Sequence, residues 1–340
     1  MAAAMNRQVR LASRPSGWVA EANFELAEAP LPEVPEGGLL VRNVYLSLDP
    51  YMRGRMNDTK SYVPPFRVGE VLQGGVVGQV VDSRNPGFAA GDWINGMLGW
   101  EQYSLSNGQG LYKLPAIEAP RSYHLGVLGM PGMTAWVGLF EIGKARKGET
   151  VFVSAASGAV GSIAGQLAKL HGCRVAGCAG SEEKVALMKS EFGFDAGFNY
   201  RSSLSLPKSI AEVCPKGIDV NFENVGGEIF EAALWNMRAY GRIALCGMVA
   251  NYNDERAEPG PRGMMSVIGK RLTIRGFIVT DHPDACKQYV AKAAQWLAEG
   301  KLNYRENVVQ GLENAPTAFI DMLKGNKVGK QVVQVAGESG

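Results

Sequence analysis

Residues 150–178, TVFVSAASGAVGSIAGQLAKLHGCRVAGC, decide the fold expected for this chain. A continuous apolar strand over 151–154 runs into a turn that contains Gly158 and Gly161. Apolar residues then recur at helical spacing, Gly172 stands where a helix would end, and a second strand follows at once. This order, with the turn reading A-x-x-G-x-x-G, predicts a dinucleotide-binding βαβ unit. An ordinary tight turn between a strand and a helix is the alternative.

Gly158 and Gly161 have different structural roles in a dinucleotide-binding βαβ unit. Gly158 allows the backbone to approach a pyrophosphate, and Gly161 allows the helix to pack closely against the strand. Phosphates bind at the N-terminus of the helix, where backbone N–H groups lack partners within the helix. The predicted phosphate site is therefore the turn from Gly158 to Gly161, which includes Ala159 and Val160.

The rest of the chain divides into two regions that differ in their sequence patterns. The first third is rich in Pro, Gly and short β-type segments, which predicts a compact, β-barrel-like unit. After about residue 120, strand-like runs alternate with helical patterns, which predicts a parallel sheet with helices on both faces. Beyond a helix expected over 284–299, the chain returns to short strands and one helix. Its 340 residues are enough for about two domains.

The composition excludes several classes of protein. Lys plus Arg number 35 and Asp plus Glu 33, so the net charge is +2, and 46% of the residues are hydrophobic. A disordered chain is excluded, and a nucleic-acid partner is not expected, because such binders usually carry a larger basic excess. We expect no membrane association, since no apolar run approaches the roughly 18 residues of a membrane span. The N-terminus has no apolar stretch typical of a secretion signal, and the odd number of cysteines, 5, favours reduced thiols in the cytoplasm.

Histidines are scarce, and this bears on catalysis. The three in the chain are His124, His171 and His282, and none shares a short window with a pair of cysteines at ligand spacing. Catalytic zinc needs three protein ligands and structural zinc a cluster such as four cysteines, so no metal site is predicted. The sequence also lacks a G-x-S-x-G nucleophile elbow.

The end of the second strand indicates which nucleotide binds. An NAD-selective site usually ends this strand with an acidic residue that binds the ribose hydroxyls, whereas here the strand ends in Ala179, Gly180 and Ser181. Ser181 can cap the next helix, and Lys184 follows in its first turn. A hydroxyl and a cation at this place suit a 2′-phosphate and favour NADPH. Lys184 as a solvated lysine on the helix surface is the alternative.

Ordered motifs along the whole chain resemble one family. Besides the turn at 155–161, they are DPYMRGRM (49–56), LGMPGMTAW (128–136), GSEEKV (180–185), FNY (198–200), ENVGGE (223–228), CGMVANYN (246–253) and LKGNKVGK (323–330). In this order they resemble the zinc-independent medium-chain dehydrogenase/reductases, in the double-bond reductase branch that includes prostaglandin, alkenal and curcumin reductases.

The resemblance implies an α/β fold with two domains. A GroES-like β-barrel catalytic domain would comprise residues 1–125 and 303–340, and a doubly wound Rossmann domain that binds NADPH would comprise 126–302. It also implies a homodimer, paired through the edge strand within RLTIRGFIV (271–279).

The resemblance further implies NADPH-dependent reduction of the activated C=C bond of a small hydrophobic enone or enal. Hydride goes to the β-carbon, no zinc takes part, and a hydrogen-bond donor must stabilise the enolate oxygen. By position, the candidate catalytic donors are Tyr51, expected on the loop that leaves a strand of the β-domain, and Tyr252, expected at the cofactor. An NADPH:quinone oxidoreductase and a nucleotide-binding protein without catalysis are the alternatives.

The cofactor residues implied by the resemblance form three groups. The turn Gly158–Gly161 would hold the pyrophosphate, and Ser181, Lys184 and Tyr200 would surround the 2′-phosphate. The adenosine and nicotinamide ends would be lined by Asn224, Cys246, Gly247, Tyr252, Phe277, Ile278, Val279 and Asn326.

The implied substrate pocket is apolar and adaptable, because several of its residues are methionines. Its expected residues are Tyr51, Tyr62, Met130, Met133 and Met248, with Met264 and Met265 as further candidates. One departure concerns Gly269, which stands where prostaglandin reductases carry a tyrosine. That donor is therefore absent here if the alignment holds.

Overall fold

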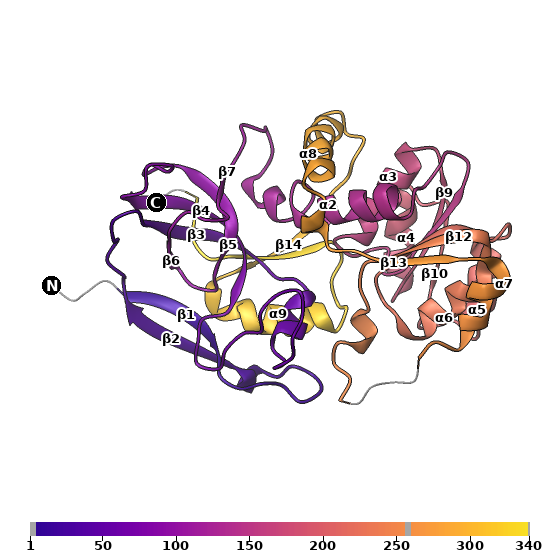
Figure 1. The fold of residues 1–340 in the computed structure, drawn as a ribbon, viewed down its shortest axis with the longest axis horizontal. Helices are drawn as coiled ribbons and strands as arrows, with labels where there is room; N and C mark the ends of the chain where they lie inside the picture. Colours follow the sequence, from indigo (N-terminus) through magenta and orange to yellow (C-terminus); the bar gives the residue numbers. More distant parts are fainter. Residues whose placement is uncertain (1–4, 256–259, 339–340) are drawn as a thin grey trace. The chain divides into compact units, whose positions relative to one another are not determined.

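The computed structural model describes residues 5–255 and 260–338. The chain forms two compact units, shown in Figure 1. Unit 1 combines Met1–Leu125 with Glu306–Gly340, and unit 2 is the continuous segment Gly126–Arg305. The chain thus leaves unit 1, completes unit 2, and returns.

Unit 2 is built on a parallel sheet of six strands in the order β10-β9-β8-β11-β12-β13. Counted along the chain, this is the order 3-2-1-4-5-6 of a doubly wound Rossmann fold. The strands are β8 (Thr150–Val153), β9 (Arg174–Ala179), β10 (Ala196–Asn199), β11 (Ile218–Glu223), β12 (Met237–Leu245) and β13 (Thr273–Gly276). The direction of winding reverses between β8 and β11, which is where such sheets bind their ligands.

Helices cover both faces of this sheet, as predicted. In β12, Ile243 packs with residues of one face, including Ile210 and Phe230, while its neighbour Ala244 packs with Val137 on the other. The helices are α2 (Met130–Trp136), η3 (Val137–Ile142), α3 (Gly161–Leu170), α4 (Glu182–Ser190), α5 (Leu206–Val213), α6 (Gly227–Asn236), α7 (Met265–Lys270) and α8 (Pro283–Ala298). Strands buried on both faces explain the continuous apolar runs in the sequence.

Unit 1 is rich in β-structure. Its main sheet has the order β14-β15-β3-β4-β5-β7, β6 pairs with β3, and β1 and β2 form a separate ribbon. The strands are β1 (Met5–Leu11), β2 (Phe24–Pro30), β3 (Leu39–Ser47), β4 (Gln73–Ser83), β5 (Trp93–Gly99), β6 (Tyr103–Ser106), β7 (Tyr112–Lys113), β14 (Glu306–Gln310) and β15 (Lys330–Gln334). The returning segment therefore supplies β14 and β15, as well as helix α9 (Ala315–Leu323).

The core of unit 1 joins the two ends of the chain. Trp100 is 1% exposed, and its ring contacts Phe24 and Phe319 at centroid distances of 6.2 and 5.9 Å. Because Phe319 belongs to α9, burial of this aromatic group depends on the return of the chain.

Two local expectations need correction. Tyr51 does not lie on a loop after β3, since it is the first residue of the short helix α1 (Tyr51–Arg55). The strand expected within 271–279 is shorter, because β13 ends at Gly276 and the short helix η6 (Val279–Asp281) follows soon after.

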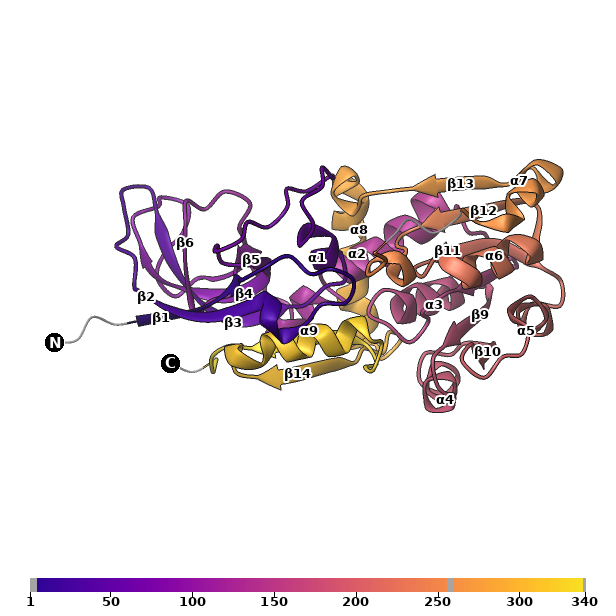
Figure 2. The same ribbon diagram turned by 90° about the horizontal axis from the view of Figure 1, so that it is seen from below.

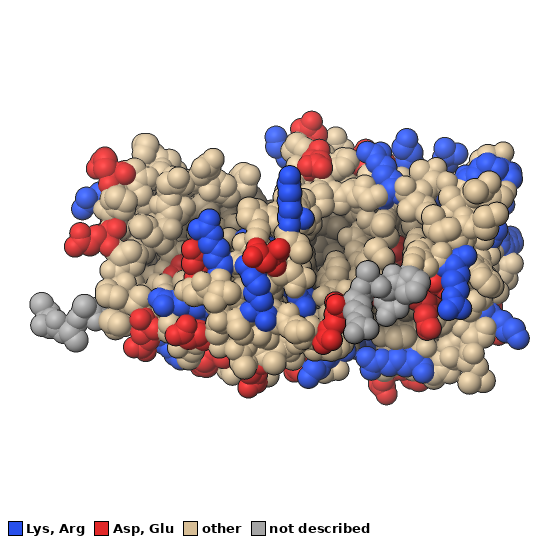
Figure 3. Space-filling view, turned by 60° about the horizontal axis from the view of Figure 1, so that its bottom comes forward, with Lys and Arg blue, Asp and Glu red and all other residues tan. Residues whose placement is uncertain are grey.

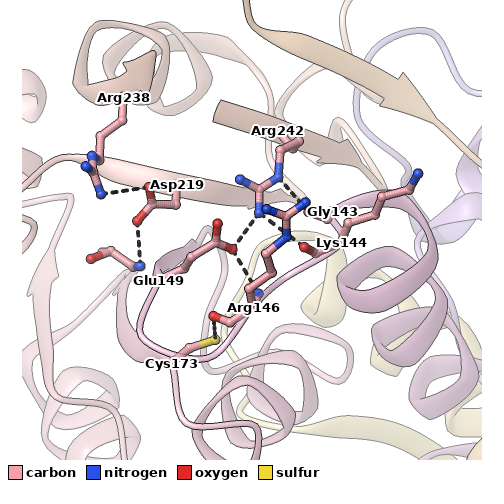
Figure 4. Close-up of polar contacts among 9 residues, drawn as sticks. Gly143, Lys144, Arg146, Glu149, Cys173, Asp219, Arg238 and Arg242 are labelled. Atoms are coloured by element: carbon pink, nitrogen blue, oxygen red, sulfur yellow. Dashed lines mark hydrogen bonds and ion pairs between the residues drawn. The ribbon is translucent and has the colours of Figure 1, made fainter. Parts of the chain in front are cut away.

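The amino-terminal edge of the unit 2 sheet is closed by charged side chains (Figure 4). Arg242 pairs with Glu149 and also donates from Nε to the carbonyl oxygen of Gly143 at 3.0 Å. Asp219 accepts from the backbone N–H of Thr150 at 2.9 Å and pairs with Arg238 at 3.0 Å. These contacts fix the strands at the edge opposite their carboxyl ends, which stay available for a ligand.

The surface carries both signs of charge, and Figure 3 shows basic and acidic side chains across the same face. Within residues 5–255 and 260–338, none of the helices has the length and apolar character needed to cross a membrane. Cys173, Cys178 and Cys214 are free and buried, and Cys246 and Cys286 are free and partly buried.

Candidate cofactor and substrate site

The turn after β8 has the close approach that its glycines predict. Helix α3 begins at Gly161, where a Cβ atom would lie 2.3 Å from the carbonyl oxygen of Ala155. At Gly158 the same oxygen would be 3.2 Å away. Ala155 itself has a φ of +48°, which is uncommon for a residue other than glycine. Gly172 has a φ of +83° directly after α3 and ends this helix as predicted.

A buried carboxylate ties this turn to the neighbouring loops. Glu223, at the end of β11, accepts from Ser154 Oγ at 2.8 Å and from the N–H groups of Val225 and Gly226 at 2.7 and 2.9 Å. Its backbone carbonyl accepts from the N–H of Cys246 at 2.8 Å. One residue thereby connects the loops after β8, β11 and β12.

These contacts also set the chemistry of the groups around Glu223. Burial raises the pKa of its carboxyl group, and the hydrogen bonds that it accepts oppose that rise. Burial and the Glu223 charge raise the pKa of the Cys246 thiol to about 12, so this cysteine is not a nucleophile at neutral pH. Asn224 is held by Ser154, since its Nδ2 donates to the Ser154 carbonyl oxygen at 2.7 Å.

Two basic side chains, Lys184 and Arg201, lie at the carboxyl end of β9. Ser181 caps α4 as predicted, because its hydroxyl accepts from the N–H of Lys184 at 3.3 Å. A Cβ atom at Gly180 would lie 3.1 Å from Tyr200 Oη and 3.3 Å from Arg201 Nε. Burial and the Arg201 charge lower the pKa of Lys184. The positive charges of Lys184 and Arg201 favour binding of an anion at this end of β9.

The loop after β12 brings Tyr252 back toward the strand end. A Cβ atom at Gly247 would lie 3.4 Å from Tyr252 Oη and 3.3 Å from the carbonyl oxygen of Asn224. Gly226 has a φ of +77°, and a Cβ atom there would lie 3.1 Å from Met248. The loops that contain Asn224 and residues 246–252 are therefore packed on each other.

These features fit a dinucleotide. Glycines at 158 and 161 let α3 start close against the turn after β8, and Lys184 and Arg201 supply positive charge where a 2′-phosphate would lie. The residues that would hold NADPH are Gly158–Gly161, Ser181, Lys184, Tyr200 and Arg201.

Other predicted residues have simpler surroundings. Phe277 packs its ring against η3, where a Cβ atom at Gly138 would lie 2.8 Å from it, while Ile278 and Val279 follow half-buried. Met130 and Met133 are half-buried on α2. Met264 and Met265 are 46% and 76% exposed. Asn326 belongs to unit 1 and is exposed after α9.

In unit 1, Tyr51 and Tyr62 surround a buried arginine. Arg55 is 6% exposed, and its guanidinium lies 4.0 Å above the ring of Phe66. Burial raises the pKa of Tyr51, the charge of Asp49 raises it further, and the charge of Arg55 lowers it. Tyr62 also acts on the pKa values of both Tyr51 and Arg55, so these three groups lie close together. Tyr51 Oη is 3.9 Å from Met97 Sδ.

Sequence reasoning missed several of these residues. Arg201 directly follows the FNY motif, and a second cation beside Tyr200 was the available signal. Glu223 opens the ENVGGE motif, but only its hydrogen bonds in the structure show that it connects three loops. Among the described residues, no three His, Cys, Asp or Glu side chains come together as a metal site.

Comparisons with known proteins place this chain in a class of oxidoreductases. Residues 7–114 match the family model described as the N-terminal domain of oxidoreductase, and residues 159–299 match the one described as zinc-binding dehydrogenase. The chain belongs to the medium-chain dehydrogenase/reductases, in their zinc-independent double-bond reductase branch. The predicted family is thereby confirmed.

Individual relatives are similar over nearly the whole length. The chain is 45% identical to the NADPH-dependent curcumin reductase of Escherichia coli (strain K12) over 338 residues, which are 98% of each chain. It is 46% identical to the NADP(+)-dependent 2-alkenal reductase of Nicotiana tabacum, again over 98% of each. The crystal structure of CurA in complex with NADPH from Vibrio vulnificus is 46% identical, with a TM-score of 0.93 over 97% of this chain and 99% of that one.

Proposed function

We propose that this protein is an NADPH-dependent reductase of activated C=C bonds in α,β-unsaturated ketones and aldehydes. The observation that carries the proposal is the carboxyl end of β9, where Arg201 lies beside Gly180 and the Arg201 charge lowers the pKa of Lys184. The similarity to NADPH-dependent curcumin and alkenal reductases over 98% of the chain supports the substrate class.

NADPH, when bound, supplies the hydride that adds to the β-carbon of the substrate. The protein must then stabilise negative charge on the enolate oxygen, and a hydroxyl donor is suited to this task. Tyr51 and Tyr252 are the proposed donors. Tyr51 has the stronger electrostatic support, because Arg55 places a buried positive charge beside it. Units 1 and 2 would be the catalytic and the nucleotide-binding domain.

The decisive experiment follows NADPH oxidation with a panel of enones and enals, quinones and simple alcohols. We expect turnover with enones and enals. Turnover of quinones alone would favour a quinone oxidoreductase, and turnover of alcohols with NAD would contradict the proposal. NADPH binding without turnover of any class would indicate a nucleotide-binding protein without catalysis.

We further propose a homodimer formed through β13. This strand is the edge of the sheet (Figure 2). Thr273, Arg275 and Gly276 are exposed along it. The preceding helix α7 exposes Met265 and Ile268 at 76% and 72%. An unpaired edge beside exposed apolar side chains is suited to pairing with a second copy. The free cysteines, three of them buried, fit the reducing cytoplasm, where we place the protein.

A further inference from the structure

Two residues that the proposed reaction leaves without a role meet inside unit 1. Asp49 opens the DPYMRGRM motif, and Lys330 ends the LKGNKVGK motif. Lys330 Nζ lies 2.9 Å from Asp49 Oδ1, and the two side chains are only 1% and 7% exposed. The pair joins residues that are 281 positions apart in the sequence.

The ion pair holds the chain where β3 ends. Lys330 Nζ also donates to the carbonyl oxygen of Leu48 and, at 3.2 Å, to that of Gln331. The second oxygen of Asp49 accepts from Ser47 Oγ. The backbone supports the same contact, since β15 pairs with β3 and Val332 lies opposite Ser47. We call this buried contact between Asp49 and Lys330, at the end of β3, the junction. Burying two charges is costly compared with burying two apolar side chains, so the pair calls for a role beyond stability.

The junction leads directly into helix α1. The N–H of Met52 donates to the Asp49 carbonyl oxygen at 3.1 Å, so the first turn of α1 is built on Asp49. A helix of five residues does not hold its own geometry, and its start is therefore set by such anchors. Tyr51 is its first residue.

The charge of Asp49 also acts on Tyr51. Asp49 raises the pKa of the Tyr51 hydroxyl, whereas Arg55 lowers it. An uncompensated carboxylate here would oppose negative charge on a ligand held by that hydroxyl. Lys330 supplies the compensating charge from β15.

We propose that Lys330 is a positioning residue for Tyr51. By binding Asp49 and the Leu48 carbonyl, it fixes the turn from which α1 starts and compensates the carboxylate whose charge acts on the Tyr51 hydroxyl. The inference rests on the proposed function, in which that hydroxyl donates to the enolate oxygen. The C-terminal return thus serves the reaction as well as the core of unit 1.

The test uses the full chain and a double-mutant cycle with Tyr51→Phe. Lys330→Met alone leaves a buried carboxylate unpaired and can prevent folding, so the main variant is Asp49→Asn with Lys330→Met, which removes both charges. We expect kcat for an enone to fall roughly tenfold to hundredfold, as for a displaced catalytic group. The Kd for NADPH should stay within about twofold, because the proposed cofactor contacts of unit 2 are intact.

The cycle separates positioning from a general structural defect. In the Tyr51→Phe background, the same double substitution should change kcat by less than about twofold, since the residue on which it acts is already disabled. The control is Asp92→Asn with Lys113→Met, which removes a 2.8 Å ion pair elsewhere in unit 1 and should leave kcat unchanged.

Two results would overturn the inference. One is a folded double variant with wild-type kcat, and the other is an equal loss of kcat in the presence and absence of the Tyr51 hydroxyl. Failure of the proposed function is distinguishable, because the unmodified protein would then not oxidise NADPH with enones. A Tyr51→Phe variant with wild-type kcat would instead refute the role of Tyr51 and, with it, that of Lys330.

Discussion

Tyr51 is the residue on which the proposed chemistry depends most. Replacing it with Phe removes one hydroxyl donor and little volume, so kcat for an enone should fall about 10²- to 10³-fold. The Kd for NADPH, measured by fluorescence titration, should not change. Tyr112→Phe is the matched control, because Tyr112 is 72% exposed in the same unit. If Tyr51→Phe reduces enones as fast as the unmodified protein, the donor to the enolate oxygen is Tyr252 or another group.

The protonation state of Tyr51 predicts the pH profile. Burial and the Asp49 charge raise its pKa above the ordinary value of 10.0. Loss of the phenol proton would remove the donor, so a raised pKa keeps the donor in place as the pH increases. We expect kcat to show no alkaline decline from this group up to about pH 10. An alkaline limb below that range which disappears in Tyr51→Phe would contradict the prediction.

Cofactor selectivity is predicted from Lys184 and Arg201. Each replacement by Ala removes a charge beside the proposed 2′-phosphate, and a hydrogen bond to a charged group is worth about 1.5–3 kcal/mol. The Kd for NADPH should therefore increase roughly tenfold to hundredfold, while the Kd for NADH stays constant. Lys189→Ala, on the exposed face of the same helix, is the control. If the Kd values for NADPH and NADH change equally, Lys184 and Arg201 do not bind the 2′-phosphate.

At the scale of elements, the β8–α3 turn allows a graded test. A methyl group at 161 would lie 2.3 Å from a backbone oxygen, whereas one at 158 would lie 3.2 Å from it. A backbone oxygen cannot move aside as a flexible side chain can. Gly161→Ala should therefore weaken NADPH binding and lower Tm much more than Gly158→Ala. Gly269→Ala, with open space at its Cβ position, should leave both unchanged. The reverse order of the two turn variants would show that helix–strand contact does not limit the turn.

The helices and strands were predicted correctly where a single local sequence pattern defines them. The apolar run of β8, the glycine that ends α3 and the serine that caps α4 are all set by neighbours within a few residues. Tyr51 was expected on a loop, because a five-residue helix has too little periodicity to be recognised. Its conformation depends on the buried junction of Asp49 and Lys330, which no local window contains.

At the scale of the whole molecule, the proposed dimer predicts an effect of charge on association. Met265→Asp with Ile268→Asp would place two carboxylates beside the β13 edge, where desolvating them opposes pairing. We expect a dimer for the unmodified protein and a monomer for this variant, measured by light scattering after size exclusion. Leu204→Asp, at an exposed apolar residue elsewhere in unit 2, should remain dimeric. An unmodified protein that is monomeric at all concentrations would refute the dimer.

The sequence by itself determined the architecture of this protein and the glycine turn between β8 and α3. Alternating strands and helices, glycine spacing and the lack of an acid at the tip of β9 are local patterns, and short-range sterics and hydrogen bonding act directly on them. Only the tertiary structure revealed Glu223 as the link between three loops, Arg201 beside Gly180, and Lys330 paired with Asp49. These contacts join residues that no local window contains. For Glu223 and for the pair of Asp49 and Lys330 the partners are fixed by burial, where an unpaired charge is too costly to persist.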